Sequence, residues 1–281
     1  MEMIKVTFPD GSVHKFEKGV KILDVAISIS EGFARNVIGA VVNDDIIKGL
    51  SETLKEDCTV KFVKFEDKEG KEIFWHTSSH VMALAIQRLF PDTKFGIGPA
   101  IENGFYYDLD SEHKFTPEDL EKIEAEMKKI VKEGYSVDRK EVDRDFALKY
   151  FAEKGQDYKI DLIEGFDKDA ELSFYELGEF TDLCRGPHLV DIKKIKAVKL
   201  LSIAGAYWRG NSDNKMLQRI YGTAYFTKEH LEQHLVRLQE ARERDHRKLG
   251  KELGIFTTSQ KVGAGLPLWL PNGATIRRTI E

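Results

Sequence analysis

The first 17 residues alternate apolar and polar side chains on either side of a short turn, and few structures other than a β-hairpin fit this pattern. The alternating apolar positions are Ile4, Val6, Phe8, Val13 and Phe16. Pro9-Asp10-Gly11 lies between them and has the composition that hairpin turns prefer. The chain is therefore expected to open with a small β-rich unit.

The next segments predict how that unit is completed. We expect a helix at residues 22–30, a strand at 37–42, a turn at Asn43-Asp44-Asp45 and a last strand at 58–65. The resulting β-β-α-β-β order predicts a β-grasp fold.

The composition changes after this unit, and 281 residues exceed what one hydrophobic core usually organises. Residues 67–70 are polar and predict a linker, followed by a helix from Thr77 or Ser78 to Phe90, because Pro91 stops it. A further helix is expected between an N-cap at Thr116 and Gly134. We interpret this region as a second domain with mixed helices and strands.

The C-terminal quarter predicts one long charged helix and a short remainder. Leu231, Leu235 and Leu238 form a single apolar stripe, which favours a connector helix over residues 227–253. The expected α+β, multidomain organisation is a β-grasp at residues 1–66, a second domain at 73–226, the connector at 227–253, and the truncated start of another domain at 254–281.

Composition limits the function classes. The N-terminus lacks the basic and apolar runs of a signal peptide, and no stretch approaches the roughly 20 apolar residues of a membrane helix, so we expect a cytoplasmic protein without a membrane partner. Cys58 and Cys184 lie in different contexts and do not suggest a disulfide.

The net charge of −5 argues against non-specific coating of nucleic acid, so any RNA contact must be local. Singly, the basic residues are interpreted as solvated faces. They are Lys193, Lys194, Lys196, Lys199, Arg209, Lys215, Arg219 and the segment 242–248.

Two motifs concentrate chemistry. His76 and His80 are four residues apart, so both imidazoles lie on one face of a helix. In Asp182-Leu-Cys184-Arg-Gly-Pro-His188, the Gly-Pro turn can bring the thiol and a third imidazole together. Such a set suits either a tetrahedral zinc site or a hydrolytic pocket. His230 and His234 repeat the spacing, but we interpret them as surface residues of the connector.

The order of several motifs resembles bacterial threonyl-tRNA synthetases over essentially the whole chain. The motifs are His76-x3-His80, Phe95–Pro99, Asn103–Asp108, Cys184–His188, Ala204–Gly210, Asn214–Thr223, Arg244–Gly250 and Leu270–Arg277. The resemblance implies an N-terminal ubiquitin-like TGS module, a connector, the start of a class II core, and an editing domain that hydrolyses seryl-tRNA(Thr). Such a second site is needed because serine differs from threonine by one methyl group, which a single binding site discriminates weakly.

The resemblance also implies editing residues, which are His76, His80, Lys159, Asp182, Cys184 and His188. In this interpretation His76 polarises a water molecule, Lys159 holds charge near the ester, and Asp182 anchors the serine amine, while the other three shape the pocket. Tyr207, Trp208 and Arg209 are expected to contact RNA by stacking, with structural packing of the aromatic rings as the alternative.

Metal binding is left as an alternative. The related alanyl-tRNA synthetase domain holds zinc with a similar quartet, whereas the threonyl family is regarded as metal-free, so we expect no metal and no cofactor for editing. ATP, Mg and Zn, together with homodimer formation, are expected only of the full-length core. Residues 256–281 contain no Cys or His ligand, so this chain alone is expected not to activate threonine.

Two other functions share part of this evidence. A free-standing deacylase that edits tRNA in trans would use the same chemistry. A TGS-type regulatory RNA-binding module is the second alternative, but the chain has no phosphate-binding Gly-x4-Gly-Lys-Ser/Thr loop.

Overall fold

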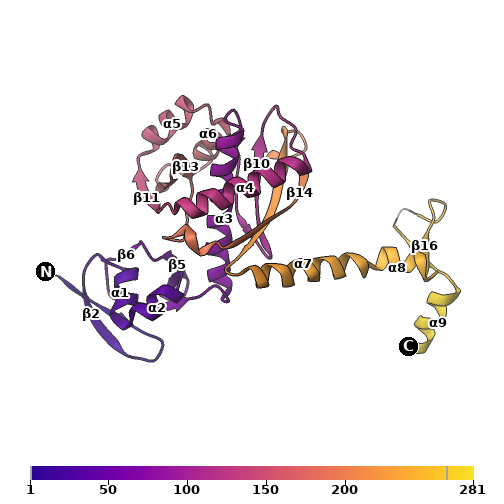
Figure 1. The fold of residues 1–281 in the computed structure, drawn as a ribbon, viewed down its shortest axis with the longest axis horizontal. Helices are drawn as coiled ribbons and strands as arrows, with labels where there is room; N and C mark the ends of the chain where they lie inside the picture. The colour runs from indigo at the N-terminus through magenta and orange to yellow at the C-terminus, as the bar shows by residue number, and fades with distance from the viewer. Residues whose placement is uncertain (1, 264) are drawn as a thin grey trace. The chain divides into compact units, whose positions relative to one another are not determined.

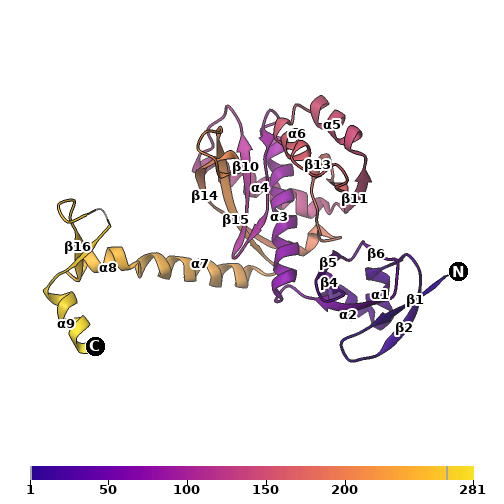
Figure 2. The same cartoon turned by 180° about the vertical axis from the view of Figure 1, so that it is seen from behind.

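A computed structural model describes residues 2–263 and 265–281, and the chain divides into two compact units at Lys228. The first unit carries a β-grasp and an α+β domain, and the second carries helices and a small hairpin (Figures 1 and 2). The α+β, multidomain fold class is therefore confirmed, while the exact domain limits stay predictions. Among the described residues, no helix is long and apolar enough to span a membrane.

The β-grasp consists of a five-stranded sheet in the order β2-β1-β7-β4-β5, with β1 and β7 parallel. Its strands are β1 (Met3–Thr7), β2 (Val13–Glu17), β4 (Gly39–Val42), β5 (Ile46–Gly49) and β7 (Cys58–Val63). The helices α1 (Ile22–Ile29) and α2 (Glu31–Asn36) cover it, and β3 (Val20–Lys21) pairs with β6 (Thr53–Leu54). The hairpin and α1 agree with expectation, whereas α2 and β5 were not expected.

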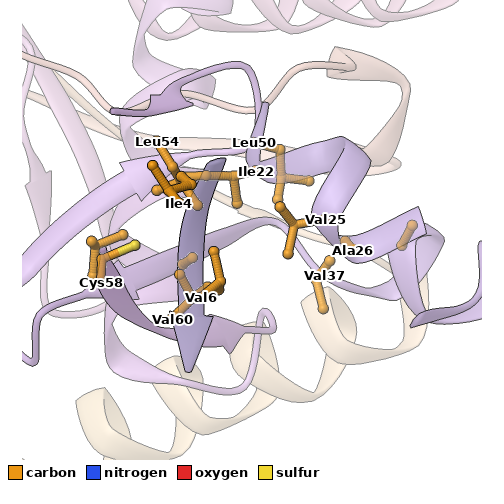
Figure 3. Packing of buried hydrophobic residues seen from close by; sticks show 13 residues of the cluster. Ile4, Val6, Ile22, Val25, Ala26, Val37, Leu50, Leu54, Cys58 and Val60 are labelled. Carbon is orange, nitrogen blue, oxygen red and sulfur yellow. The ribbon is translucent and has the colours of Figure 1, made fainter. Parts of the chain in front are cut away.

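The core of this unit contains side chains from both helices and the sheet. Figure 3 shows Val6 of β1 beside Val60 of β7 and Ile4 of β1 beside Ile22 of α1, and Val25 of α1 belongs to the same cluster. All five side chains are buried. The alternating apolar positions of the first strand therefore bury one face, as the period of two in a half-buried strand requires.

The expected linker at residues 67–70 and the expected helix start at Thr77 or Ser78 are wrong, because α3 (Lys68–Leu89) begins within the supposed linker, with Asp67 as its N-terminal cap residue. Gly70 permits this close connection: a Cβ atom there would lie 1.7 Å from the Lys64 carbonyl oxygen. From Ile73 to Ile86 nearly every residue of α3 is buried, so it is the central helix of the second domain.

Two sheets pack around α3. The larger has the order β14-β15-β10-β8, with β9 also paired to β10, and the smaller has the order β11-β12-β13. The strands are β8 (Lys94–Phe95), β9 (Ala100–Ile101), β10 (Gly104–Asp110), β11 (Val137–Val142), β12 (Leu172–Leu177), β13 (Phe180–Leu183), β14 (Ala197–Tyr207) and β15 (Met216–Tyr225).

Three more α-helices and two short 3-10 helices complete this domain. They are α4 (Pro117–Glu133), α5 (Arg144–Glu153), α6 (Asp157–Glu164), η1 (Ile192–Lys194) and η2 (Trp208–Gly210). The cap of α4 is as expected: Thr116 and Asp119 form a capping box, and Gly134 adopts a left-handed conformation with φ of 75°.

The connector differs from the single helix expected over residues 227–253. It consists of α7 (Lys228–Glu243) and α8 (His246–Glu252), because Asp245 accepts a hydrogen bond from the Arg247 backbone and caps a new helix. The interpretation of His234 as a surface residue is also wrong, since it is buried with 7% exposure, whereas His230 is exposed. The unit ends with β16 (Phe256–Thr258), β17 (Pro267–Trp269) and α9 (Pro271–Ile280).

Arg88, near the end of α3, connects three elements of the second domain. Its guanidinium pairs with Glu126 at 3.2 Å and Glu133 at 3.0 Å on α4, and with Glu179 at 2.5 Å between β12 and β13. It also donates to the Tyr135 hydroxyl at 3.1 Å. Hydrogen bonding to Glu179 and Glu133 raises the pKa of Arg88, so it stays charged.

We expect Arg88→Ala to lower the free energy of unfolding of this domain by about 1–3 kcal/mol, because several charge-assisted hydrogen bonds are lost together. Urea unfolding followed by tryptophan fluorescence measures this, using a Trp269→Phe background in which only Trp75 and Trp208 report. Lys140→Ala removes a single exposed ion pair and is the control. An equal effect of both substitutions would contradict the assigned importance of Arg88.

Candidate active site

The four side chains singled out by the two motifs converge. α3 supplies His76 and His80, and the segment after β13 supplies Cys184 and His188. The Cys184 sulfur lies 3.2 Å from Nε2 of His76 and 3.3 Å from Nε2 of His188. One ligand-type atom from each of the four side chains lies within 4.8 Å of the others.

Local hydrogen bonds position the cysteine. The Cys184 backbone N–H donates to the Ser173 carbonyl at 3.1 Å, and the Ser173 hydroxyl donates to the Cys184 carbonyl at 2.6 Å, so the β12-β13 pairing continues to the thiol. Gly186 turns the chain with φ of 69°, and a Cβ atom there would lie 2.0 Å from the Tyr175 hydroxyl. Only glycine therefore fits at this turn.

A buried polar network lies beside the quartet. Asp182 forms an ion pair with Lys159 of α6, accepts a hydrogen bond from the Tyr107 hydroxyl at 2.5 Å, and lies 3.3 Å from Nε2 of His80. Lys159 also donates to the Tyr107 hydroxyl at 3.2 Å. All four side chains are almost completely buried.

Tyr107 is the member of this network that sequence reasoning missed. It lies in β10, within the Asn103–Asp108 motif, and its strand position faces the interior. Gly98 packs against its ring so closely that a Cβ atom would lie 2.3 Å from the ring carbons. The signal available in the sequence was a tyrosine in an aromatic Phe-Tyr-Tyr run, because a tyrosine that becomes buried in a strand needs a hydrogen-bond partner for its hydroxyl.

Burial determines the protonation of the quartet. It lowers the pKa of His76 to about 4 and that of His80 to about 3, although the Asp182 charge acts in the opposite direction. Burial and the two neighbouring imidazoles hold the pKa of His188 well below its usual range. Burial, together with Asp182, raises the pKa of the Cys184 thiol to about 12. At neutral pH these four side chains are therefore uncharged.

The charges are confined to the ion pair. Burial acts to raise the pKa of Asp182, but Lys159, His80 and the Tyr107 hydrogen bond outweigh it and leave that pKa lowered. Burial and the Asp182 charge raise the pKa of Tyr107 well above its ordinary value. Tyr107 is thus a neutral donor to an ionised carboxylate.

A cavity of about 360 Å³ opens onto these groups. His76, His80 and Cys184 line it together with the ion pair of Lys159 and Asp182, and most of the other lining residues are apolar. Arg185 lies at its exposed rim, with the guanidinium 5.6 Å from the centre of the Phe166 ring. The cavity has the size of a small-ligand site that combines apolar walls with a few polar groups.

The donor set also fits a metal ion. A tetrahedral zinc site places sulfur and nitrogen ligands about 3.6 Å apart, and the sulfur of Cys184 is at comparable distances from His76 and His188. Nδ1 of His80 is buried without a hydrogen-bond partner among the described residues, while its Nε2 faces Asp182. Such a carboxylate behind an imidazole is typical of metal-bound histidines.

The three residues expected to contact RNA differ in exposure and in their partners within the protein. Trp208 is buried with 7% exposure, its indole N–H donates to Asp161, and its ring packs on Tyr158 with centroids 4.9 Å apart. These contacts favour the structural packing that the sequence left as the alternative to RNA stacking for Trp208. Tyr207 is 41% exposed, and Arg209 is exposed but paired with Asp161 at 3.0 Å.

Most of the other basic candidates are also engaged within the protein. Lys199 pairs with Glu124, Lys215 with Asp110, and Arg219 with Asp108. Lys194 donates to two backbone carbonyls. Internal pairing explains these charges without nucleic acid.

Comparisons with known proteins agree with this architecture. The family model "TGS domain" matches residues 4–64, and "Threonyl and Alanyl tRNA synthetase second additional domain" matches residues 172–221. The second match contains Asp182, Cys184 and His188. The fold and site thus define a chain with a TGS module and a synthetase-type additional domain.

Similar proteins identify the family. The threonine–tRNA ligase of Finegoldia magna is 60% identical over 279 residues, which is 99% of this chain and 44% of that relative. The ligase of Clostridioides difficile is 55% identical over 99% of this chain and 43% of its own length. Threonine–tRNA ligase 1 of Bacillus subtilis is 54% identical over 100% of this chain and 43% of its own length. The chain belongs to the threonine–tRNA ligase family and spans less than half the length of these curated relatives.

The lowered pKa of the buried histidines makes stability depend on pH. Between about pH 6.5 and about pH 4, His80 is protonated in the unfolded chain but not in the folded chain. The free energy of unfolding therefore falls as the pH falls, and each such histidine contributes about 1.4 kcal/mol per pH unit. Urea unfolding across this range measures the slope. We expect a smaller slope for His80→Gln, and an identical slope would contradict the assignment.

Proposed function

We propose that the quartet and the buried ion pair hydrolyse the ester of mischarged seryl-tRNA(Thr). The observation that supports this most strongly is a neutral, partly exposed imidazole, His76, at the wall of a cavity beside a buried lysine–carboxylate pair. A neutral imidazole can accept a proton from water at neutral pH, which is the chemistry that ester hydrolysis needs. Membership in the threonine–tRNA ligase family supports the choice of tRNA substrate.

In the proposed reaction, a water oxygen adds to the ester carbonyl carbon while His76 accepts the water proton. The bond between that carbon and the ribose oxygen of the terminal adenosine then breaks, and the proton passes to the leaving oxygen. The ammonium group of Lys159 stabilises the negative charge that develops on the ester. The Cys184 thiol, whose pKa is raised to about 12, remains protonated and does not act as a nucleophile.

Asp182 has a restricted role in this scheme. An ionised carboxylate offers about four lone-pair positions, and three partners already approach it, namely Lys159, Tyr107 and His80. One position therefore remains for the α-ammonium of serine. His80 and His188 shape the pocket, while Tyr207 remains a proposed contact for tRNA.

A bound metal would be held by His76, His80, Cys184 and His188, and it would supply Lewis-acid activation of water. We propose the metal-free alternative, because hydrogen bonds between the thiol and the two imidazoles account for three of the four side chains. His80 is held by Asp182.

Aminoacylation of tRNA(Thr), with ATP, Mg and Zn and a homodimeric core, is proposed for the whole protein of which this chain spans part. Location in the cytoplasm is likewise proposed. Hydrolysis in trans by a free-standing protein remains the alternative with the same site chemistry.

The first functional prediction concerns selectivity. The chain is expected to hydrolyse seryl-tRNA(Thr) at least about 10-fold faster than threonyl-tRNA(Thr), because the proposed serine pocket is expected to exclude the additional methyl group, which is worth roughly 1–3 kcal/mol. Deacylation of both esters under single-turnover conditions measures the ratio. Equal rates would refute the proposed substrate.

The second concerns the site. His76→Ala is expected to reduce hydrolysis at least about 100-fold, because this is the contribution of a general base. His230→Ala changes an exposed histidine of the connector and should leave the rate unchanged.

The third prediction concerns the metal. Elemental analysis of the active protein is expected to find less than stoichiometric zinc. One equivalent of zinc that is lost on chelation together with activity would replace the metal-free scheme by the metal-bound one.

A further inference from the structure

The Ala204–Gly210 motif, which suggested RNA binding, holds a helix of the candidate site instead. The Trp208 indole N–H donates to the Asp161 carboxylate at 2.7 Å, and Nε of Arg209 lies 3.0 Å from the same oxygen. Nη2 of Arg209 donates to the Asp161 backbone carbonyl at 2.7 Å. Asp161 belongs to α6, which carries Lys159.

α6 depends on such contacts for its position. It has only eight residues and no side-chain hydrogen bond at its N-terminal cap, and isolated helices of this length are unstable in water. The Gln156 side chain accepts a hydrogen bond from the Phe95 backbone at 2.8 Å, and the Tyr158 hydroxyl donates to Asp110 at 2.8 Å. Asp157 of α6 also pairs with Lys94 of β8 at 2.5 Å. Asp161 therefore makes one of several polar contacts that connect α6 and its N-terminal cap with the larger sheet.

These contacts surround the one functional side chain of the helix. Lys159 lies between Tyr158 and Asp161 in sequence, is 3% exposed, and forms its ion pair with Asp182 on the opposite side of α6 from Trp208. A displacement of α6 would move the Lys159 ammonium relative to the Asp182 carboxylate. Among the described residues that line the cavity, Lys159 is the one lysine.

The backbone of the motif is held in an unfavourable conformation at the same place. Arg209 has φ of 55° and ψ of 21°, in the left-handed region that non-glycine residues rarely occupy. Such a conformation is unfavourable for a residue with a side chain and persists where surrounding contacts stabilise it. The contacts between the Arg209 guanidinium and Asp161 stabilise this backbone conformation.

We propose that Trp208 and Arg209 are positioning residues that hold α6 so that Lys159 reaches the ester in seryl-tRNA hydrolysis. The inference rests on the proposed deacylase function. A positioning role and an RNA contact have different kinetic effects. Loss of positioning slows the chemical step, whereas loss of an RNA contact weakens the affinity for the substrate.

Steady-state deacylation by the whole 281-residue chain tests the proposal. Trp208→Phe retains an aromatic ring and removes the N–H donor, and we expect kcat to fall about 10-fold with KM nearly unchanged, since small misplacements of a catalytic group are costly. Arg209→Gln should act in the same direction. A raised KM with unchanged kcat would overturn the proposal in favour of an RNA contact.

A double-mutant cycle separates positioning from general destabilisation. In a Lys159→Ala background, measured in single turnover, Trp208→Phe should cause less than about a twofold further loss, because the group being positioned is absent. Arg88→Ala is the control, because Arg88 stabilises the same domain without contacting α6. Its effect on the rate should be the same with and without Lys159. A full 10-fold loss in the Lys159→Ala background would overturn the proposal.

A readout without hydrolysis distinguishes failure of the inference from failure of the proposed function. Acetylation of lysines, followed by mass spectrometry, should label Lys159 slowly in the unsubstituted chain and several-fold faster in Trp208→Phe, with no such change in Arg88→Ala. If the unsubstituted chain does not hydrolyse seryl-tRNA, the proposed function fails but this measurement still tests the helix contact. Unchanged labelling of Lys159 in Trp208→Phe would overturn the inference.

Discussion

The buried ion pair between Lys159 and Asp182 is the interaction on which the site depends. Removing two charges from water costs several kcal/mol each, and their attraction compensates only when other hydrogen bonds satisfy the remaining groups. Tyr107 and His80 provide those bonds from β10 and α3. Because the ion pair requires partners from four elements, its position determines how α3, α6, β10 and β13 meet.

The ion pair also explains why the neighbouring quartet is uncharged. With one positive and one negative charge already buried, a further charge on His76, His80 or Cys184 would lose hydration without a partner of its own. The pKa values of both histidines are lowered and that of the thiol is raised. The site thus separates a charged pair, suited to stabilising a polar transition state, from neutral groups suited to accepting a proton.

Features that depend on neighbouring residues could be predicted from the sequence, whereas features that depend on distant contacts could not. The spacing of His76 and His80 and the N-cap at Thr116 depend on neighbours within one or two helical turns, and the structure agrees with both. The burial of Trp208 depends on Asp161, 47 positions away, and a Tyr-Trp-Arg sequence is the same whether it contacts RNA or protein. The early start of α3 was missed because it depends on close packing of Gly70 against Lys64, which no periodic pattern reveals.

The β-grasp and the loop of the candidate site are structurally connected within the first unit. A Cβ atom at Gly49 of β5 would lie 3.1 Å from the His188 carbonyl oxygen and 3.3 Å from the Pro187 side chain. Val190 packs against the β-grasp core, and Lys194 donates at 2.9 Å to the Arg35 and Val37 carbonyls near the end of α2. Since those carbonyls lack partners within the helix, the lysine both caps α2 and secures the chain beyond His188. The segment that carries His188 is therefore supported by Tyr175 on one side and by the β-grasp on the other, so the first domain contributes to the geometry of a site to which it supplies no side chain.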